Sequence, residues 1–149
     1  MREHVIVSGE LSKMAHKDLY HLSDDLYATI SDCLILSLPE LPSDISRLHI
    51  ASTWTDIIRL AVWKDEPAMG DVYLLLKGLG IRPEELLPFS NSDINDLFPW
   101  LYYGKRFDIL RKVCLTAKTN SEKHLKNSDA RVHCHLISEE RTCIVASSL

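Results

Sequence analysis

The chain has 149 residues, 46% of them hydrophobic and 26% charged, with a formal net charge of −4. This length and apolar content suit one soluble domain with a single core, and no apolar run approaches the roughly 20 residues that a membrane-spanning helix needs. The four cysteines are scattered and no secretory leader precedes them, which argues against a disulfide scaffold and favours a reducing, cytoplasmic location.

The first structural signal in the chain comes after a weakly patterned start. Residues 1–17 contain one short apolar alternation, at Val5 and Val7, and are expected to form a loosely ordered lead-in. Ser23 then offers an N-cap followed by acidic residues, which oppose the helix dipole. Apolar residues recur at helical spacing as far as Leu38, so we expect the first helix here.

Short helices dominate the next part of the predicted chain. Residues 39–52 form a proline-punctuated connector with one helical turn. A helix is predicted from Thr53 to Trp63, another over residues 69–79, and a further one beginning at Pro83, because proline fits the first helical position. With little strand signal between them, these helices predict an all-α fold, a small antiparallel helical bundle over residues 18–89.

The remaining residues are more polar and more basic. We expect residues 90–118 to form a basic helical extension and residues 119–149 to form a linker and flexible tail. Residues 1–103 carry sixteen acidic against eight basic side chains, whereas residues 104–131 carry three acidic against eight basic ones. The end of the tail alternates and could form a hairpin, although a lone hairpin is marginal in water.

The predicted helix pair resembles the second half of a death domain of the Pelle and interleukin-1-receptor-associated kinase type. The resemblance is carried by Ile57-Ile58, Trp63, the turn after it, Met69 to Leu76 and Glu84 to Pro88. It covers about half of the chain, and the connector at residues 39–52 is shorter than two family helices and their loop require. The motifs of the kinase domain are absent from the sequence, so this would be a divergent relative without the kinase.

The resemblance implies a non-enzymatic interaction module in intracellular receptor signalling of the Toll/interleukin-1 receptor pathway in innate immunity. The protein would act as an adaptor or a competitor, and its partners would be other death-domain proteins or further copies of itself. Exposed charges at loop and helix ends would then supply the contacts: Asp65, Glu66, Arg82, Glu84 and Glu85. A surface that faces only solvent and binds no partner would carry the same kind of charges.

Three other functional readings of the sequence are weaker. The basic segment 104–131 could bind nucleic acid through phosphate contacts, but the chain as a whole is acidic. The group His133-Cys134-His135 with Cys143 is the only hint of zinc; on a strand the two histidines would share a face and Cys134 would point away. No catalytic motif is present, so we expect no enzyme, no cofactor and no metal.

Overall fold

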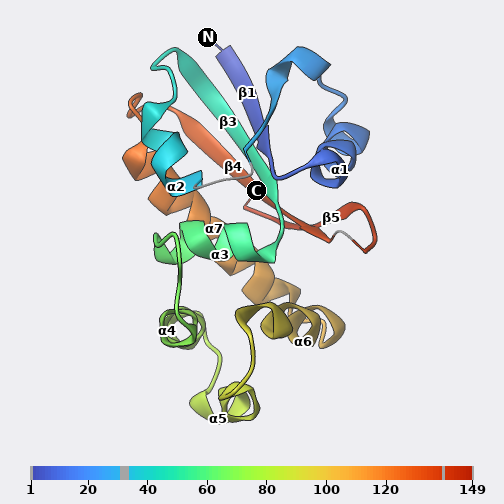
Figure 1. Ribbon diagram of the computed structural model, residues 1–149, viewed down its shortest axis with the longest axis vertical. Helices are drawn as coiled ribbons and strands as arrows, with labels where there is room; N and C mark the ends of the chain where they lie inside the picture. The colour runs from blue at the N-terminus through green and yellow to red at the C-terminus, as the bar shows by residue number, and fades with distance from the viewer. Residues whose placement is uncertain (1, 31–33, 139, 149) are drawn as a thin grey trace.

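The computed structural model describes residues 2–30, 34–138 and 140–148, and its centre is a mixed β-sheet (Figure 1). The five strands lie in the order β2-β1-β3-β4-β5; the first four are parallel and β5 is antiparallel to β4. Their bounds are β1 (Arg2–Val7), β2 (Tyr27–Thr29), β3 (Ile45–Ser52), β4 (Arg131–Ser138) and β5 (Cys143–Ser147). The fold is therefore α/β, and the predicted all-α bundle is wrong.

Helices cover both faces of this sheet. The α-helices of the described chain are α1 (Glu10–Tyr20), α2 (Leu34–Ser37), α3 (Trp54–Val62), α4 (Met69–Gly78), α5 (Pro83–Leu86), α6 (Leu97–Tyr103) and α7 (Phe107–His124). The long α7 packs on α3 and β4 on one face, and α1 lies on the other. The helices α4, α5 and α6 lie beyond the end of the sheet at which β3 and β4 finish (Figure 1). No helix in the described ranges combines the length and apolarity needed to cross a bilayer.

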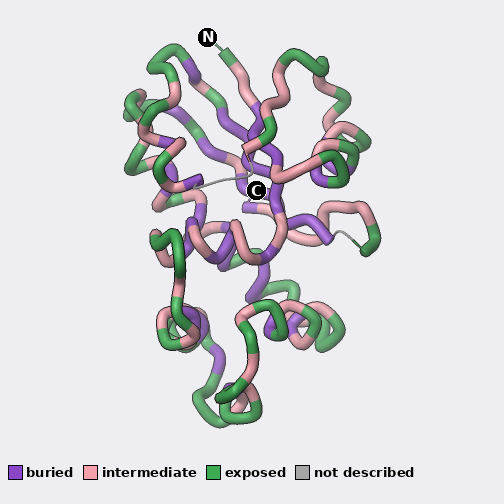
Figure 2. Tube along the Cα trace, viewed as in Figure 1, coloured by how far each residue is buried: buried purple, intermediate pink, exposed green. Residues whose placement is uncertain are grey.

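The central strands are buried on both faces, which explains their sequences. On β3, Leu48 and Ile50 enter the main core below α3 and α7, while Ala51 belongs to a smaller core below α1. Figure 2 shows the buried residues concentrated in the strands and in the helices that lie against them. A parallel strand covered on both faces has no strict apolar–polar alternation, so β3 does not show the usual strand pattern.

The predicted helix from Ser23 to Leu38 is wrong. A short 3-10 turn at Asp24–Leu26 leads into β2, which pairs in parallel with β1. The capping signals at Ser23 are genuine local preferences, but the main-chain hydrogen bonds that β1 offers to residues 27–29 outweigh them. Cys33, within the range of that predicted helix, lies outside the described residues.

Both chain ends contribute strands, unlike the lead-in and tail that the sequence suggested. Residues 2–7 form β1, and the alternating stretch near the C-terminal end forms β4 and β5. The turn expected around residues 45–50 is instead β3, which lies between β1 and β4. The sequence of each segment gives only a weak strand signal, because each strand is stabilised by neighbours that are distant in the sequence.

The helices predicted between Thr53 and Pro83 are confirmed. Thr53 occupies the N-cap position of α3, although its side chain makes no capping hydrogen bond. Helix α4 covers Met69–Gly78, and Pro83 stands at the first position of α5. Local signals were sufficient here because these helices bury one apolar stripe each.

Candidate metal centre

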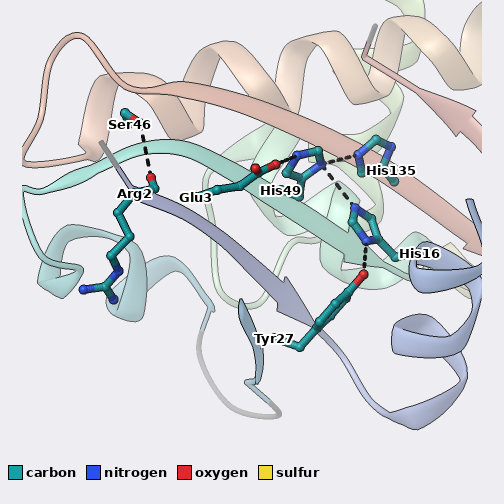
Figure 3. Close-up of polar contacts among 7 residues, drawn as sticks. All are labelled: Arg2, Glu3, His16, Tyr27, Ser46, His49 and His135. Carbon is teal, nitrogen blue, oxygen red and sulfur yellow. Dashed lines mark hydrogen bonds and ion pairs between the residues drawn. The ribbon is translucent and has the colours of Figure 1, made fainter. Parts of the chain in front are cut away.

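Three histidine side chains meet beneath α1, on the face of the sheet opposite α7 (Figure 3). His16 comes from α1, His49 from β3 and His135 from β4, and their exposed fractions are 0%, 4% and 0%. In the parallel register of β3 and β4, Ala51 pairs with His135, so His49 and His135 are diagonal neighbours on one face. We call these three residues the histidine triad.

The inner ring nitrogens of the triad converge. His49 Nδ1 lies 3.2 Å from His16 Nε2 and 3.1 Å from His135 Nε2. One ligand atom from each of the three residues lies within 4.8 Å of the others. Two imidazole nitrogens bound tetrahedrally to zinc at about 2.0–2.1 Å stand about 3.4 Å apart. The two distances to His49 Nδ1 are therefore close to this spacing, and all three ligand atoms lie within 4.8 Å of one another.

The outer nitrogen of each ring has its own partner, and Figure 3 shows those of His16 and His49. His16 Nδ1 lies 2.7 Å from the Tyr27 hydroxyl, and His135 Nδ1 lies 2.8 Å from the Ser147 hydroxyl. His49 Nε2 lies 2.9 Å from Glu3 Oε1. Metal-binding histidines usually donate their second N–H to a carboxylate, carbonyl or water, which fixes the ring and the tautomer. Glu3 is such a partner for His49, whereas the partners of His16 and His135 are hydroxyl groups, which can donate or accept.

The hydroxyl partners allow two proton arrangements. When Tyr27 and Ser147 donate, His16 Nε2 and His135 Nε2 carry hydrogens that both point to the lone pair of His49 Nδ1. When the two hydroxyls accept instead, all three inner nitrogens carry lone pairs. In the first arrangement two N–H groups share one lone pair, whereas the second would leave three lone pairs available to a cation.

Burial keeps the triad neutral, which is the form that binds metals. Desolvation, followed by the charge of a neighbouring histidine, lowers the pKa of His16 to about 4 and that of His135 to about 3. Desolvation also lowers the pKa of His49, against the opposing effect of the Glu3 hydrogen bond. Protons therefore compete weakly with a metal ion at neutral pH.

These pKa values predict acid sensitivity of the metal-free protein. Below pH 6.5 the unfolded chain binds protons at these histidines, whereas folded His16 and His135 accept them only near pH 4 and pH 3. Stability should be complete above pH 6.5 and fall by about 1.4 kcal/mol per histidine for each pH unit below it, down to about pH 4 for His16 and about pH 3 for His135. Urea unfolding at a series of pH values measures this slope, and the double variant His16→Gln, His135→Gln should flatten it.

A cavity of about 290 Å³ reaches the triad from outside, lined by Glu3, Tyr20, Arg47, His49 and His133. The Tyr20 ring stacks on His16 with 4.5 Å between centroids and covers the triad on this side. His133 Nδ1 is buried and has no hydrogen-bond partner within the described ranges. Of the three triad residues, His49 alone lines this cavity.

The zinc group suggested by the sequence does not assemble. Cys134 faces the opposite side of the sheet, in the core with α7, as the strand alternation requires. Burial raises the pKa of its thiol well above the ordinary value. His135 does belong to a metal-like group, but its partners His16 and His49 lie far away in the sequence.

The charged residues predicted to bind a partner lie elsewhere, near α4 and α5 rather than α1. Asp65 and Glu66 are exposed in the turn after α3, and Arg82 and Glu84 are exposed at the start of α5. Glu85 is half-buried and accepts a hydrogen bond from the Arg82 backbone. Contact with a partner through these five residues stays a prediction, and none of them takes part in the triad.

Comparison with known proteins shows one distant similarity to an enzyme. No family model matches the chain, and no solved structure matches it significantly. The chain is similar to the cobalt-precorrin-5B C(1)-methyltransferase of Desulfotalea psychrophila, with 29% identity over 154 aligned positions. The match covers 97% of this chain and 41% of the relative, so the chain spans about two fifths of that protein's length.

This similarity and the mixed sheet correct three predictions. The death-domain resemblance is wrong, because that family is all-α and this fold is α/β. A non-enzymatic role in Toll/interleukin-1 receptor signalling loses its basis with it. The expectation of no enzyme is contradicted by distant similarity to a methyltransferase over nearly the whole chain.

Proposed function

We propose that the protein is a metal-dependent enzyme in which His16, His49 and His135 hold a divalent transition-metal ion of the zinc type. The observation that carries this proposal is the convergence of three buried imidazole nitrogens whose outer nitrogens all have hydrogen-bond partners. Imidazole nitrogen suits zinc, copper, iron and nickel, whereas magnesium and calcium prefer oxygen. The Glu3 carboxylate adds a negative charge beside the ligands, which favours a cation.

The number of ligands favours catalysis over a purely structural role. Structural zinc sites are closed by four protein ligands, whereas catalytic sites have three and leave one position for water or substrate. Such a metal lowers the pKa of bound water to about 7 or polarises a carbonyl or phosphoryl oxygen. The cavity at His49 and Tyr20 lies beside the triad, and a small molecule would reach the open position from it once the Tyr20 ring moves aside. The reaction we propose is hydrolysis or a related attack by metal-bound water.

A second candidate is methyl transfer, which the similarity to the cobalt-precorrin-5B C(1)-methyltransferase favours. It takes second place because the chain spans only 41% of that relative, and the triad geometry by itself indicates a metal rather than a methyl donor. The scattered cysteines suggest a cytoplasmic location, and this location is compatible with both proposed functions.

Metal loading tests the leading proposal. The full chain is dialysed against Zn²⁺ or Co²⁺, and elemental analysis should find one ion per chain. The Co²⁺ form should show visible absorption that shifts when azide is added, because azide enters an open coordination position. Hydrolysis of 4-nitrophenyl acetate should require the metal and rise with pH near 7.

The matched control is His124→Gln, because His124 is an exposed histidine that stacks on Trp63, outside the triad. It should bind metal and hydrolyse the ester like the unchanged protein. Bound metal with no azide shift would indicate a closed, structural site. A chain that takes up no metal at neutral pH would refute the proposal altogether.

A further inference from the structure

The ring of Tyr20 lies at nearly the same distance from all three rings of the histidine triad. Its centroid is 4.5 Å from that of His16, 5.1 Å from that of His49 and 5.2 Å from that of His135. The three histidine centroids are 4.9, 5.2 and 5.4 Å from one another. The four rings therefore occupy the vertices of a nearly regular tetrahedron, with Tyr20 at the fourth vertex.

The size of this tetrahedron matches a metal ion at its centre. An ion about 2.0–2.1 Å from an imidazole nitrogen lies about 3.2 Å from the centroid of that ring, and the centre of this tetrahedron lies about 3.1 Å from each vertex. An ion held by the three histidines would thus have the Tyr20 ring in the direction of its fourth ligand. An oxygen ligand at about 2.0–2.2 Å from the ion would stand about 1 Å from the centroid of the Tyr20 ring. The ring must therefore leave before water or substrate can bind the ion.

Few contacts hold the Tyr20 ring in this position. Tyr20 is the last residue of α1, and His21 after it adopts the left-handed conformation, with φ 56°. The Tyr20 hydroxyl makes no hydrogen bond to another residue that the structure describes, whereas the Tyr27 hydroxyl lies 2.7 Å from His16 Nδ1. The Tyr20 ring can therefore move without breaking a hydrogen bond to these residues.

The cavity beside the triad gives this ring a place to go. Tyr20 is half-buried and lines the cavity of about 290 Å³. A cavity of about 150 Å³ is enough to hold a benzene molecule. The displaced ring would therefore fill about half of the space, and the other half would remain for a ligand of a few atoms.

We infer that Tyr20 is the gate of the metal centre and determines which molecules reach the ion; this inference rests on the proposed function. With the ring in place, the bound ion has three ligands and is shielded from water. When the ring swings into the cavity, the fourth position opens to a small molecule or to a small protruding group of a larger one. Exclusion of water until the substrate enters protects a metal site from side reactions.

Azide titration of the Co²⁺-loaded full chain, followed by visible absorption, tests the gate. A site that must open before it binds loses apparent affinity in proportion to its open fraction. Opening forfeits three ring contacts, each of which changes an equilibrium constant by about 2- to 12-fold. Tyr20→Ala should therefore lower the azide dissociation constant by more than about 10-fold, while Co²⁺ uptake stays at one ion per chain.

Tyr20→Phe is the matched control, because it keeps the ring and should keep the azide affinity of the unchanged protein. Leu19→Ala alters the same end of α1 at a side chain that is 60% exposed and should also have no effect. Tyr20→Leu retains an apolar side chain, in case the alanine variant does not fold, and should act in the same direction as Tyr20→Ala.

The outcomes separate this inference from the proposed function. Equal azide affinity in the unchanged protein and in Co²⁺-loaded Tyr20→Ala overturns the gate and leaves the metal enzyme standing. A Tyr20→Phe variant that binds azide as tightly as Tyr20→Ala also overturns it, because the hydroxyl and not the ring would then control access. No uptake of Co²⁺, or bound Co²⁺ without an azide shift in any of these variants, overturns the proposed function and the gate together.

Discussion

Replacing His135 with glutamine should lower the affinity of the protein for Zn²⁺ by more than about 100-fold. Loss of a group that merely supports a metal ligand costs about 10- to 100-fold, and His135 would be a ligand itself. Its Nε2 lies 3.1 Å from His49 Nδ1 at the centre of the triad. Competition with a fluorescent zinc chelator measures the affinity directly.

A graded series makes this test specific. Glu3→Gln removes the charged partner of His49 Nε2 without removing a ligand, so it should cost about 10- to 100-fold. His16→Gln repeats the ligand loss from α1, in case the substitution on β4 disturbs folding. His124→Gln should have no effect. Circular dichroism on metal-free samples shows whether each variant is folded, and equal zinc affinity in all folded variants would rule out the triad as the binding site.

The substitution Leu136→Asp should abolish cooperative folding at neutral pH. Leu136 is 0% exposed and packs in the main core, on the central strand β4. An unpaired carboxylate there cannot be hydrated, and the apolar contacts of the leucine are lost as well. Mutations of this kind cost more than about 4–5 kcal/mol, which is close to the whole stability of many domains.

Leu74→Asp is the matched control, because Leu74 on α4 is 70% exposed. It should change the free energy of unfolding by less than about 0.5 kcal/mol. Thermal melting followed by circular dichroism compares the two variants. If Leu136→Asp melted like the unchanged protein, residue 136 would belong to a free tail, and the position of β4 in the sheet would be wrong.

The success and failure of the sequence predictions follow from how local each element is. Helices α3 and α4 carry their apolar stripes and their end signals within their own residues, so the sequence predicts both helices correctly. Strands β1 and β3 are covered on both faces, so neither shows alternation over its full length. The death-domain resemblance arose from these helices together with the wrongly predicted first helix, Leu22 to Leu38. Apolar spacing in a few helices does not determine a fold.

The candidate site could not be predicted because its parts come from distant places. The alternation His133-x-His135 marked one ligand, but the partner group proposed for it contained Cys134, which faces the other side of the sheet. His16 and His49 stand alone in their segments, and a lone histidine carries no signal of a ligand. Their meeting depends on the order β1-β3-β4 and on α1 crossing that face, neither of which short-range patterns specify.

The pairing of β3 with β4 has a consequence for how the chain folds. Arg47 and Arg131 are register partners, so the two adjacent strands β3 and β4 are joined by the whole segment from α3 to α7. Contacts of such high sequence separation are formed at a large entropic cost, which makes folding slow for a chain of this size. The helices can form early, but the triad assembles only when β4 docks. A metal ion that binds the triad can do so only after this step. Zinc should therefore lower the rate of unfolding more than it raises the rate of folding.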